Sequence, residues 1–263
     1  MNFASSVERL WFISDIHLSQ DKPHITKIFK EFLAVVEHKS APYHSHLFIL
    51  GDLFETWIGD DDDSIFHQEI KKILIDFTSN GFQTYFIHGN RDFLIGKDFA
   101  NEVGIKILSD PYTITTHRGK YILSHGDFLC TSDLDYMDFR AMVRSEKWQK
   151  NFLSKNLDER RLIASSMRSN SKKASSKKSP EVTDVDIESV NNFFEENEFC
   201  TLIHGHTHRP KIHKHGHSNR RIVLGDWDKS GWYFCIFNTI DYTKRDLEEF
   251  RSYEETMHLL RYS

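Results

Sequence analysis

The chain has 263 residues, of which 39% are hydrophobic and 28% charged, and its formal net charge is -5. This composition is typical of an ordinary globular protein, and so mild a charge gives no support for a nucleic-acid partner, which we do not expect. A chain of this length suits one large domain, with or without an elaborated insertion, and buries enough surface to fold without disulfides.

Cysteine usage and the distribution of apolar residues favour a cytosolic protein. Cys130, Cys200 and Cys235 are scattered and form no C-x-x-C pair, which indicates a reducing compartment and argues against a thiolate zinc site. The N-terminus lacks the basic start and long apolar stretch of a signal peptide. No stretch approaches the ~18 apolar residues that span a bilayer. We therefore expect a cytosolic protein whose contact with a membrane is peripheral. We also expect it to be a monomer.

The first half of the chain alternates apolar runs with helical periodicity. Buried strands are predicted over 10–13, 47–50 and 82–87, because each run is apolar and stops abruptly at a Ser-Asp, Gly-Asp or His-Gly pair. Helices are predicted over 25–36 and 65–77, where apolar residues recur at helical spacing, and residues 60–64 are predicted to cap the second. Such alternation predicts crossover connections around a largely buried sheet, an α/β architecture.

The second half changes its period and carries a helical interruption. A hairpin is predicted at 112–124 around Arg118-Gly119, and strands resume at 201–203, 221–224 and 231–237. Between them lies a stretch with helical periodicity. We therefore predict a core, a helical insertion that forms a lid and a C-terminal tail, with boundaries at 1–132 and 197–243, 133–196, and 244–263.

Five polar motifs each follow one of the apolar runs. Because strands of an open α/β sheet deliver their carboxyl ends to one edge, the motifs are expected to converge there. The motifs are Asp15-Ile16-His17, Gly51-Asp52, Gly89-Asn90-Arg91-Asp92, His125-Gly126-Asp127 and His204-Gly205-His206-Thr207-His208.

The residue types in these motifs are those that bind a pair of metal ions. Carboxylate, amide and imidazole ligands without thiolate suit manganese, iron or zinc. A single carboxylate such as Asp52 is able to bridge two ions, which then clamp a phosphoryl oxygen. Any one of these motifs alone is more often a capped loop or a core histidine, but five in order favour the metal centre. The predicted ligands are Asp15, His17, Asp52, Asn90, His125, His204 and His206, and the role of His208 is left open.

The ordered set resembles the calcineurin-like metallophosphoesterase superfamily, whose pattern is D-x-H, G-D, G-N-[HR]-D, H and G-H-x-H. The resemblance implies a four-layer αββα sandwich with a helical insertion cap and two ions per subunit, which the family suggests are Mn2+. It also implies that Asp52 is shared between the ions. Asp15, His17 and His206 would complete one site, and Asn90, His125 and His204 the other.

One branch of that superfamily looks closer. The stretches LGDLFETWIGDDD, YFIHGNRDFLIGKDFA, MRSNSKKASSKKS and LIHGHTHRP resemble the UDP-2,3-diacylglucosamine pyrophosphatase family of lipid A biosynthesis, from about residue 10 to about residue 237. The implied reaction is hydrolysis of UDP-2,3-diacylglucosamine to UMP and 2,3-diacylglucosamine 1-phosphate, by attack of water on the α-phosphorus. The implied location is the cytoplasmic face of the inner membrane, bound peripherally.

The same resemblance supplies candidate catalytic and substrate-binding residues. Arg91 is expected to stabilise the transition state, since a guanidinium donates paired hydrogen bonds to a phosphoryl group. Asp92 is expected to orient Asn90 or a ligand histidine. Ser175 stands where relatives carry Asn or Thr. The implied substrate contacts are Asn90, Arg91, Asp133, Ser171, Ser175, Lys178 and His204.

The predicted insertion suits an acylated substrate. Its Trp, Phe, Met and Leu residues are expected to form an apolar groove, and its seven basic residues between Arg160 and Pro180, with no acidic one, to face a sugar phosphate or an anionic leaflet. The alternative for that basic segment is a solvated linker. The run Asp60–Asp63 lacks calcium-loop spacing and is interpreted as a helix cap. Two other functions are a different phosphoesterase on the same metal core and a non-catalytic scaffold.

Overall fold

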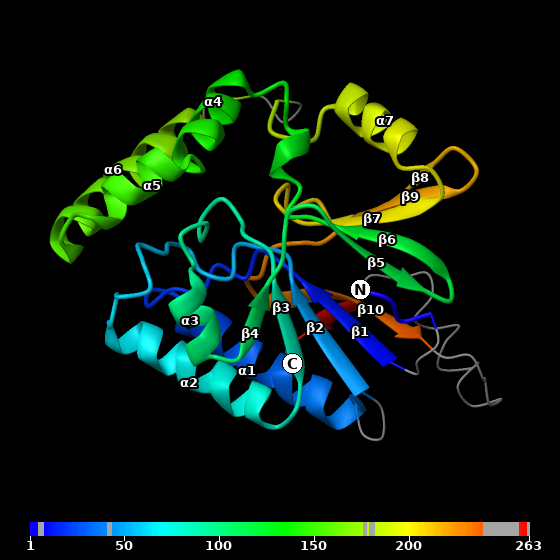
Figure 1. The fold of residues 1–263 in the computed structure, drawn as a ribbon, viewed down its shortest axis with the longest axis horizontal. Helices are drawn as coiled ribbons and strands as arrows, with labels where there is room; N and C mark the ends of the chain where they lie inside the picture. Colours follow the sequence, from blue (N-terminus) through cyan, green and yellow to red (C-terminus); the bar gives the residue numbers. More distant parts are fainter. Residues whose placement is uncertain (5–7, 41–43, 176–177, 179–181, 239–257, 262–263) are drawn as a thin grey trace.

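The computed structural model describes residues 1–4, 8–40, 44–175, 178, 182–238 and 258–261, and they build two facing β-sheets (Figure 1). The first sheet has the order β11-β10-β1-β2-β3-β4, with β1 to β4 parallel and β10 antiparallel to both β1 and β11. Its strands are β1 (Glu8–Ile13), β2 (His44–Ile49), β3 (Gln83–Phe86), β4 (Ile105–Ile107), β10 (Ser230–Asn238) and β11 (His258–Arg261).

The second sheet has the order β5-β6-β7-β9-β8. β6, β7 and β9 are parallel, whereas β5 and β8 pair antiparallel at the two edges. The predicted hairpin at 112–124 is therefore confirmed as β5 and β6. The strands are β5 (Tyr112–Thr116), β6 (Gly119–Leu123), β7 (Cys200–His204), β8 (Lys211–His215) and β9 (Asn219–Val223).

Successive side chains of β1 point alternately into two separate apolar cores. Leu10 and Phe12 are fully buried between the two sheets, where Phe12 stacks on Phe48 of β2. Trp11 and Ile13, on the opposite face, pack among the outer helices. Because successive side chains of a strand point to opposite faces, a run that is apolar throughout belongs to a strand covered on both sides.

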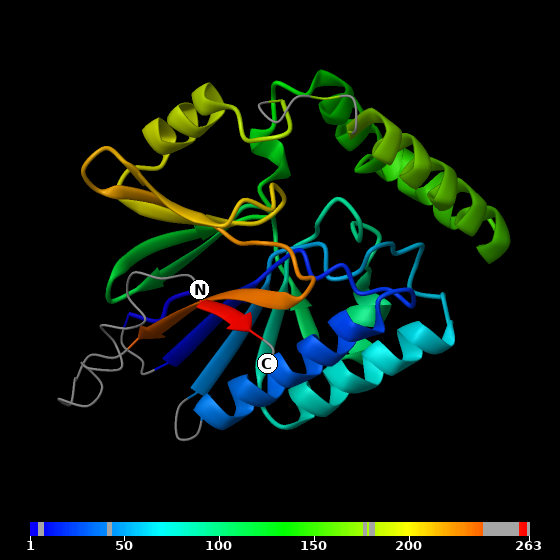
Figure 2. The ribbon, with the colours of Figure 1, turned by 180° about the vertical axis from the view of Figure 1, so that it is seen from behind.

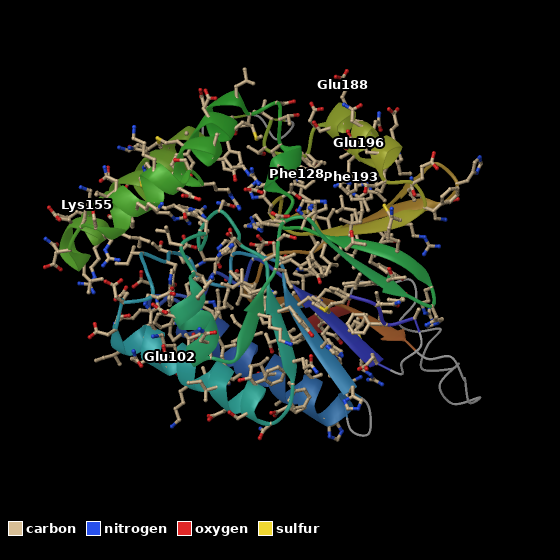
Figure 3. All side chains as sticks on the ribbon, viewed as in Figure 1. Glu102, Phe128, Lys155, Glu188, Phe193 and Glu196 are labelled. Atoms are coloured by element: carbon tan, nitrogen blue, oxygen red, sulfur yellow. The ribbon has the colours of Figure 1, made fainter. Side chains whose placement is uncertain are left out.

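Helices cover the outer face of each sheet. Behind the first sheet lie α1 (Pro23–Ser40), α2 (Ile65–Ser79) and α3 (Lys97–Glu102), and Ser64 caps α2 by accepting the backbone N–H of His67. Behind the second sheet lies α7 (Ile187–Glu196). The ring centroid of its Phe193 lies 5.9 Å from that of Phe128 (Figure 3). The layers therefore run helix, sheet, sheet, helix, which confirms the αββα sandwich.

The predicted insertion over 133–196 separates into two parts. Helices α4 (Leu134–Val143), α5 (Glu146–Leu153) and α6 (Leu157–Ser175) stand apart from the sheets, above the loops at their carboxyl ends (Figure 1). We call these three helices the lid. In contrast, α7 buries Val190 and Phe194 against the second sheet, so it belongs to the sandwich. Of the described helices, none is long and apolar enough to cross a membrane.

The C-terminal tail is partly integrated into the sandwich. β11, within the predicted tail 244–263, pairs with β10 at the edge of the first sheet (Figure 2). The rest of that predicted tail, 244–257 and 262–263, lies outside the described residues.

Candidate active site

Five loops at the carboxyl ends of the strands carry the candidate metal ligands. In the first sheet these loops follow β1, β2 and β3, and they hold Asp15, His17, Asp52 and Asn90. In the second sheet they follow β6 and β7, and they hold His125, His206 and His208, while His204 is the last residue of β7.

The backbone of these loops is conformationally strained. Of the six non-glycine residues with positive φ among those described, five lie here, with φ from 52 to 69°. Residues with side chains seldom adopt this left-handed conformation, and a cluster of them marks a functional site held by its surroundings. The five are Asp15, His17, Asp52, His206 and His208.

One half of the ligand cluster joins the first loop to the last. His208 Nε2 lies 3.2 Å from His17 Nε2 and 3.4 Å from Asp15 Oδ1. The Asp15 carboxylate also accepts the backbone N–H of His206 at 3.0 Å. Gly205 makes this approach possible, since a Cβ there would lie 2.1 Å from Asp15 Oδ2.

The other half gathers around Asn90. Its Oδ1 lies 2.9 Å from both His125 Nε2 and His206 Nδ1. Asp52 lies between the halves, with Oδ1 3.8 Å from His125 Nε2 and Oδ2 3.9 Å from His17 Nδ1. The structure thus brings a single carboxylate within reach of both groups.

The arrangement fits divalent cations. His125 Nδ1 lies 2.9 Å from the carbonyl of Leu50 and donates to it, so a neutral ring directs its Nε2 lone pair at the Asn90 oxygen. Among the described residues, the buried His17 Nδ1 also has no hydrogen-bond partner. When these rings are neutral, their lone pairs converge with the Asn90 oxygen on one space, where a cation would be stabilised, and oxygen and imidazole donors suit divalent transition metals.

Burial tunes the protonation of the imidazoles. It lowers the pKa of His17 and of His206 to about 3, so both rings are neutral near pH 7 and keep a lone pair for a metal ion. Burial also opposes a charge on His125, but the carboxylates of Asp52, Asp15 and Asp127 outweigh it and raise its pKa to about 9. A cation at this position would replace that proton.

His204, predicted as a ligand and a substrate contact, is not brought into the cluster. Its Nδ1 donates to the Gly205 carbonyl at 2.8 Å, and its Nε2 accepts from Arg221 at 3.2 Å. Both ring nitrogens are thus engaged by protein groups. Because the residue is also fully buried, no face of the ring is open to substrate. In this geometry His204 offers no free nitrogen to a metal ion or to a substrate.

His208 is the residue that the sequence reasoning left unassigned. The signal for it was present, because the pattern G-H-x-H contains a glycine, and that glycine is Gly205. Matched on Gly205, the pattern selects His206 and His208 rather than His204 and His206. The contacts of His208 with His17 and Asp15 agree with this choice.

Asp92 holds the backbone of both the Asp52 loop and the Asn90 loop. Its carboxylate accepts backbone N–H groups of Leu53 at 2.7 Å, Gly89 at 2.9 Å and Asp52 at 3.2 Å. Burial, reinforced by the charge of Asp52, raises the pKa of Asp92 to about 7. The backbone N–H of Arg91 in turn donates to Asp52 Oδ1 at 2.9 Å.

A cavity of about 440 Å³ opens between the lid and the ligand loops. Most of its wall is apolar and comes from loops of the core and from all three lid helices. The polar groups of the lining include five predicted substrate contacts, namely Asn90, Arg91, Asp133, Ser171 and Lys178. The side chain of Ser175 lies outside those that the structure describes. The apolar wall comprises Trp57, Phe93, Leu94, Phe139, Met142, Trp148, Phe152, Ala164, Met167 and Ala174.

Comparison with known proteins identifies relatives over most of the chain. The family model described as calcineurin-like phosphoesterase matches residues 8–210. A UDP-2,3-diacylglucosamine hydrolase of Histophilus somni (strain 2336) is 40% identical over 221 residues, which cover 84% of this chain and 93% of that protein. Another, from Enterobacter sp. (strain 638), is 44% identical over 223 residues, covering 84% and 91%. A dimetal phosphatase from Danio rerio has a TM-score of 0.48 at 10% identity, with 90% and 94% of the chains covered.

The family match includes all five ligand loops. The family model extends from β1 to beyond His208, and the curated relatives align over most of both chains. The chain therefore belongs to the calcineurin-like phosphoesterase family, and it is a hydrolase.

Proposed function

We propose that this hydrolase cleaves the pyrophosphate bond of UDP-2,3-diacylglucosamine, giving UMP and 2,3-diacylglucosamine 1-phosphate by attack of water on the α-phosphorus. One observation carries the proposal, namely an apolar cavity that opens directly onto Asn90 and Arg91 beside the metal loops. Such a cavity suits acyl chains, and its polar end suits the phosphates. The names of the relatives agree with this substrate.

The ligand cluster would hold two divalent cations, which we propose to be Mn2+. Asp52 would bridge them. Asp15, His17 and His208 would complete one site, and Asn90, His125 and His206 the other, as the short distances within each half suggest. Bound there, the cations would supply Lewis-acid activation of water and of the phosphoryl oxygens.

Arg91 is the group best placed to bind the developing charge. It lines the cavity, and its buried Nε lies 3.9 Å from Asp52 Oδ2 and has no hydrogen-bond partner in the part of the chain that the structure describes. A guanidinium donates paired hydrogen bonds to phosphoryl oxygens but cannot donate a proton as an acid. This suits the reaction, because the leaving group is itself a phosphate that needs little protonation.

The polar end of the cavity would orient the sugar phosphate. Lys178 Nζ donates to Asp133 Oδ2 at 2.6 Å, while Asp133 Oδ1 caps α4 by accepting the backbone N–H of Tyr136 at 3.1 Å. The ammonium is thereby fixed at the cavity wall together with Ser171. Substrate phosphate would compete for its remaining hydrogens.

The lid would contact the cytoplasmic face of the inner membrane, from which the lipid substrate is drawn. Four large apolar side chains of the lid are exposed, at 42 to 73%, and basic residues lie among them. Apolar insertion together with basic residues is the usual basis of peripheral binding to an anionic leaflet. The four are Leu134, Met142, Leu153 and Leu162. We propose that the enzyme acts there as a monomer.

Product analysis tests the reaction. Purified enzyme is incubated with Mn2+ and UDP-2,3-diacylglucosamine, and the nucleotide product is identified by chromatography. Release of UMP is expected. Release of UDP, or failure to turn over this lipid while a simple phosphodiester is hydrolysed, would instead favour the second candidate, a different metal-dependent phosphodiesterase on the same core.

A further inference from the structure

The loop Gly59–Asp63 lies beside the start of lid helix α6, and the metal chemistry makes no use of it. Asp60 holds the loop to the core, since its carboxylate accepts the backbone N–H groups of Gly96 at 2.9 Å and Phe99 at 3.0 Å. It also accepts the indole N–H of Trp57, a residue of the cavity wall, at 3.1 Å. The loop is therefore a rigid part of the core.

Arg160, in the first turn of α6, is anchored on this loop. Its Nη1 donates to Asp61 Oδ1 at 2.7 Å and to the Ile58 carbonyl at 2.8 Å, and its Nη2 donates to Asp61 Oδ2. Although it is an arginine, it is only 2% exposed. A guanidinium this buried depends on its partners, since an unpaired buried charge is strongly unfavourable.

The backbone is shaped for this contact. Gly59 has a φ of +136°, and a Cβ there would lie 2.4 Å from Arg160 Nη1 and 3.0 Å from Leu153 Cδ2. Only glycine fits under the guanidinium in this conformation. The neighbouring pair, Arg161 Nη2 to Asp62 Oδ1 at 3.1 Å, adds a second link between α6 and the loop.

Arg160 lies on the side of α6 that faces the cavity. Ala164, Met167 and Ser171 line the cavity and follow Arg160 by 4, 7 and 11 positions, which is helical spacing along one face. A helix is stiff and rises 1.5 Å per residue. Fixing its first turn therefore fixes how the helix is rotated about its axis, and with it the direction in which Ser171 faces, about 16 Å further along. The contact between Asp61 and Arg160 therefore lies where it can set the position of the cavity wall that α6 forms.

We infer that Asp61 and Arg160 are a positioning pair that holds α6 over the cavity and so sets the affinity for the acylated substrate. The identity of the substrate rests on the proposed function, whereas the attachment of α6 to the core by this pair does not. Neither residue lines the cavity or joins the ligand cluster, so hydrolysis of a small phosphodiester does not require them.

The experiment compares Asp61→Asn with Asp63→Asn, a matched control at an exposed position of the same loop. For UDP-2,3-diacylglucosamine, Asp61→Asn is expected to raise KM about tenfold or more, because small displacements of positioning groups have large kinetic effects. With bis(p-nitrophenyl) phosphate, its kcat/KM is expected to match that of the wild type and the control. Equal losses on both substrates, or no change on either, would overturn the inference.

Two further measurements keep the test decisive. In a double-mutant cycle, adding Asp61→Asn to Arg160→Met should cost little more than Arg160→Met alone, because the partner is already gone. Hydrogen exchange of α6 amides should be faster in Asp61→Asn than in Asp63→Asn, whatever substrate the enzyme uses. Unchanged exchange in α6 would refute the anchor, whereas failure of the wild type to hydrolyse the lipid would refute only the proposed function.

Discussion

At the residue scale, the backbone of the ligand loops selects among identical side chains. His204, His206 and His208 alternate along one segment, yet the first is still in β7 and points to Arg221. The other two have positive φ and turn toward the cluster. Residue type and spacing predicted that this segment supplies two ligands. Spacing alone could not show which two, whereas the glycine of the G-H-x-H pattern selects His206 and His208, and the loop geometry around Gly205 and Asp15 agrees with that choice.

Substituting the histidines one at a time tests this selection. His208→Gln is expected to reduce bound Mn2+ from two ions per chain toward one and to lower kcat at least a hundredfold, because a direct ligand is lost. His204→Gln should retain both ions. Metal content is measured by elemental analysis of protein dialysed against Mn2+. Retention of two ions by His208→Gln with loss in His204→Gln would restore the original assignment.

Asp92 is a second residue whose role depends on backbone contacts. Asp92→Asn replaces one acceptor oxygen with a donor that faces backbone N–H groups, and is expected to destabilise the fold by about 1–3 kcal/mol. Because those N–H groups belong to the Asp52 and Asn90 loops, activity should also fall about ten- to hundredfold. Urea denaturation and steady-state kinetics provide the two measurements. Wild-type activity at full stability would contradict the positioning role.

At the element scale, apolar runs predicted the strands well because those strands are covered on both faces. β1, β2 and β3 were found within about three residues of their predicted limits. α3 and β4 were not predicted, since six and three residues are too few to display a period. The insertion was predicted as one unit because periodicity reports that a helix has an apolar face, not which surface covers it. Only the packing of Phe193 and Phe194 assigns α7 to the sandwich.

This division of the insertion predicts different consequences in its two parts. Phe194→Ala in α7 should lower the free energy of unfolding by about 3–5 kcal/mol, because it leaves a cavity in the core under the second sheet. The folded fraction should keep the wild-type KM for the lipid substrate, since Phe194 does not line the cavity beneath the lid. Urea unfolding and kinetics at low temperature measure both quantities. A raised KM with unchanged stability would place α7 in the lid after all.

At the scale of the whole molecule, two sheets converge on one edge and deliver ligands from both sides of the sandwich. The first sheet supplies Asp15 and Asn90, and the second supplies His125 and His206. Cations bound by ligands from both sheets would therefore link the two sheets to each other. The order of the motifs predicted this architecture through the family resemblance, while the anchoring of the lid emerged only from the structure.

Removing the metal should loosen the whole sandwich. Chelation with EDTA is expected to abolish activity and lower Tm, because a ligand at a hundredfold excess over its Kd stabilises the native state by about 2.7 kcal/mol. Adding Mn2+ back should restore both, as followed by differential scanning calorimetry and activity. An unchanged Tm after complete metal removal, confirmed by elemental analysis, would show that the cluster does not bind ions tightly in the native state.

Hydrolysis in water enriched with oxygen-18 tests the central claim most directly. If water attacks the α-phosphorus beside Arg91 and the ligand cluster, mass spectrometry should find one labelled oxygen in UMP and none in 2,3-diacylglucosamine 1-phosphate. Label in the lipid phosphate, with unlabelled UMP, would mean that the sugar-linked phosphorus is attacked and would contradict the account.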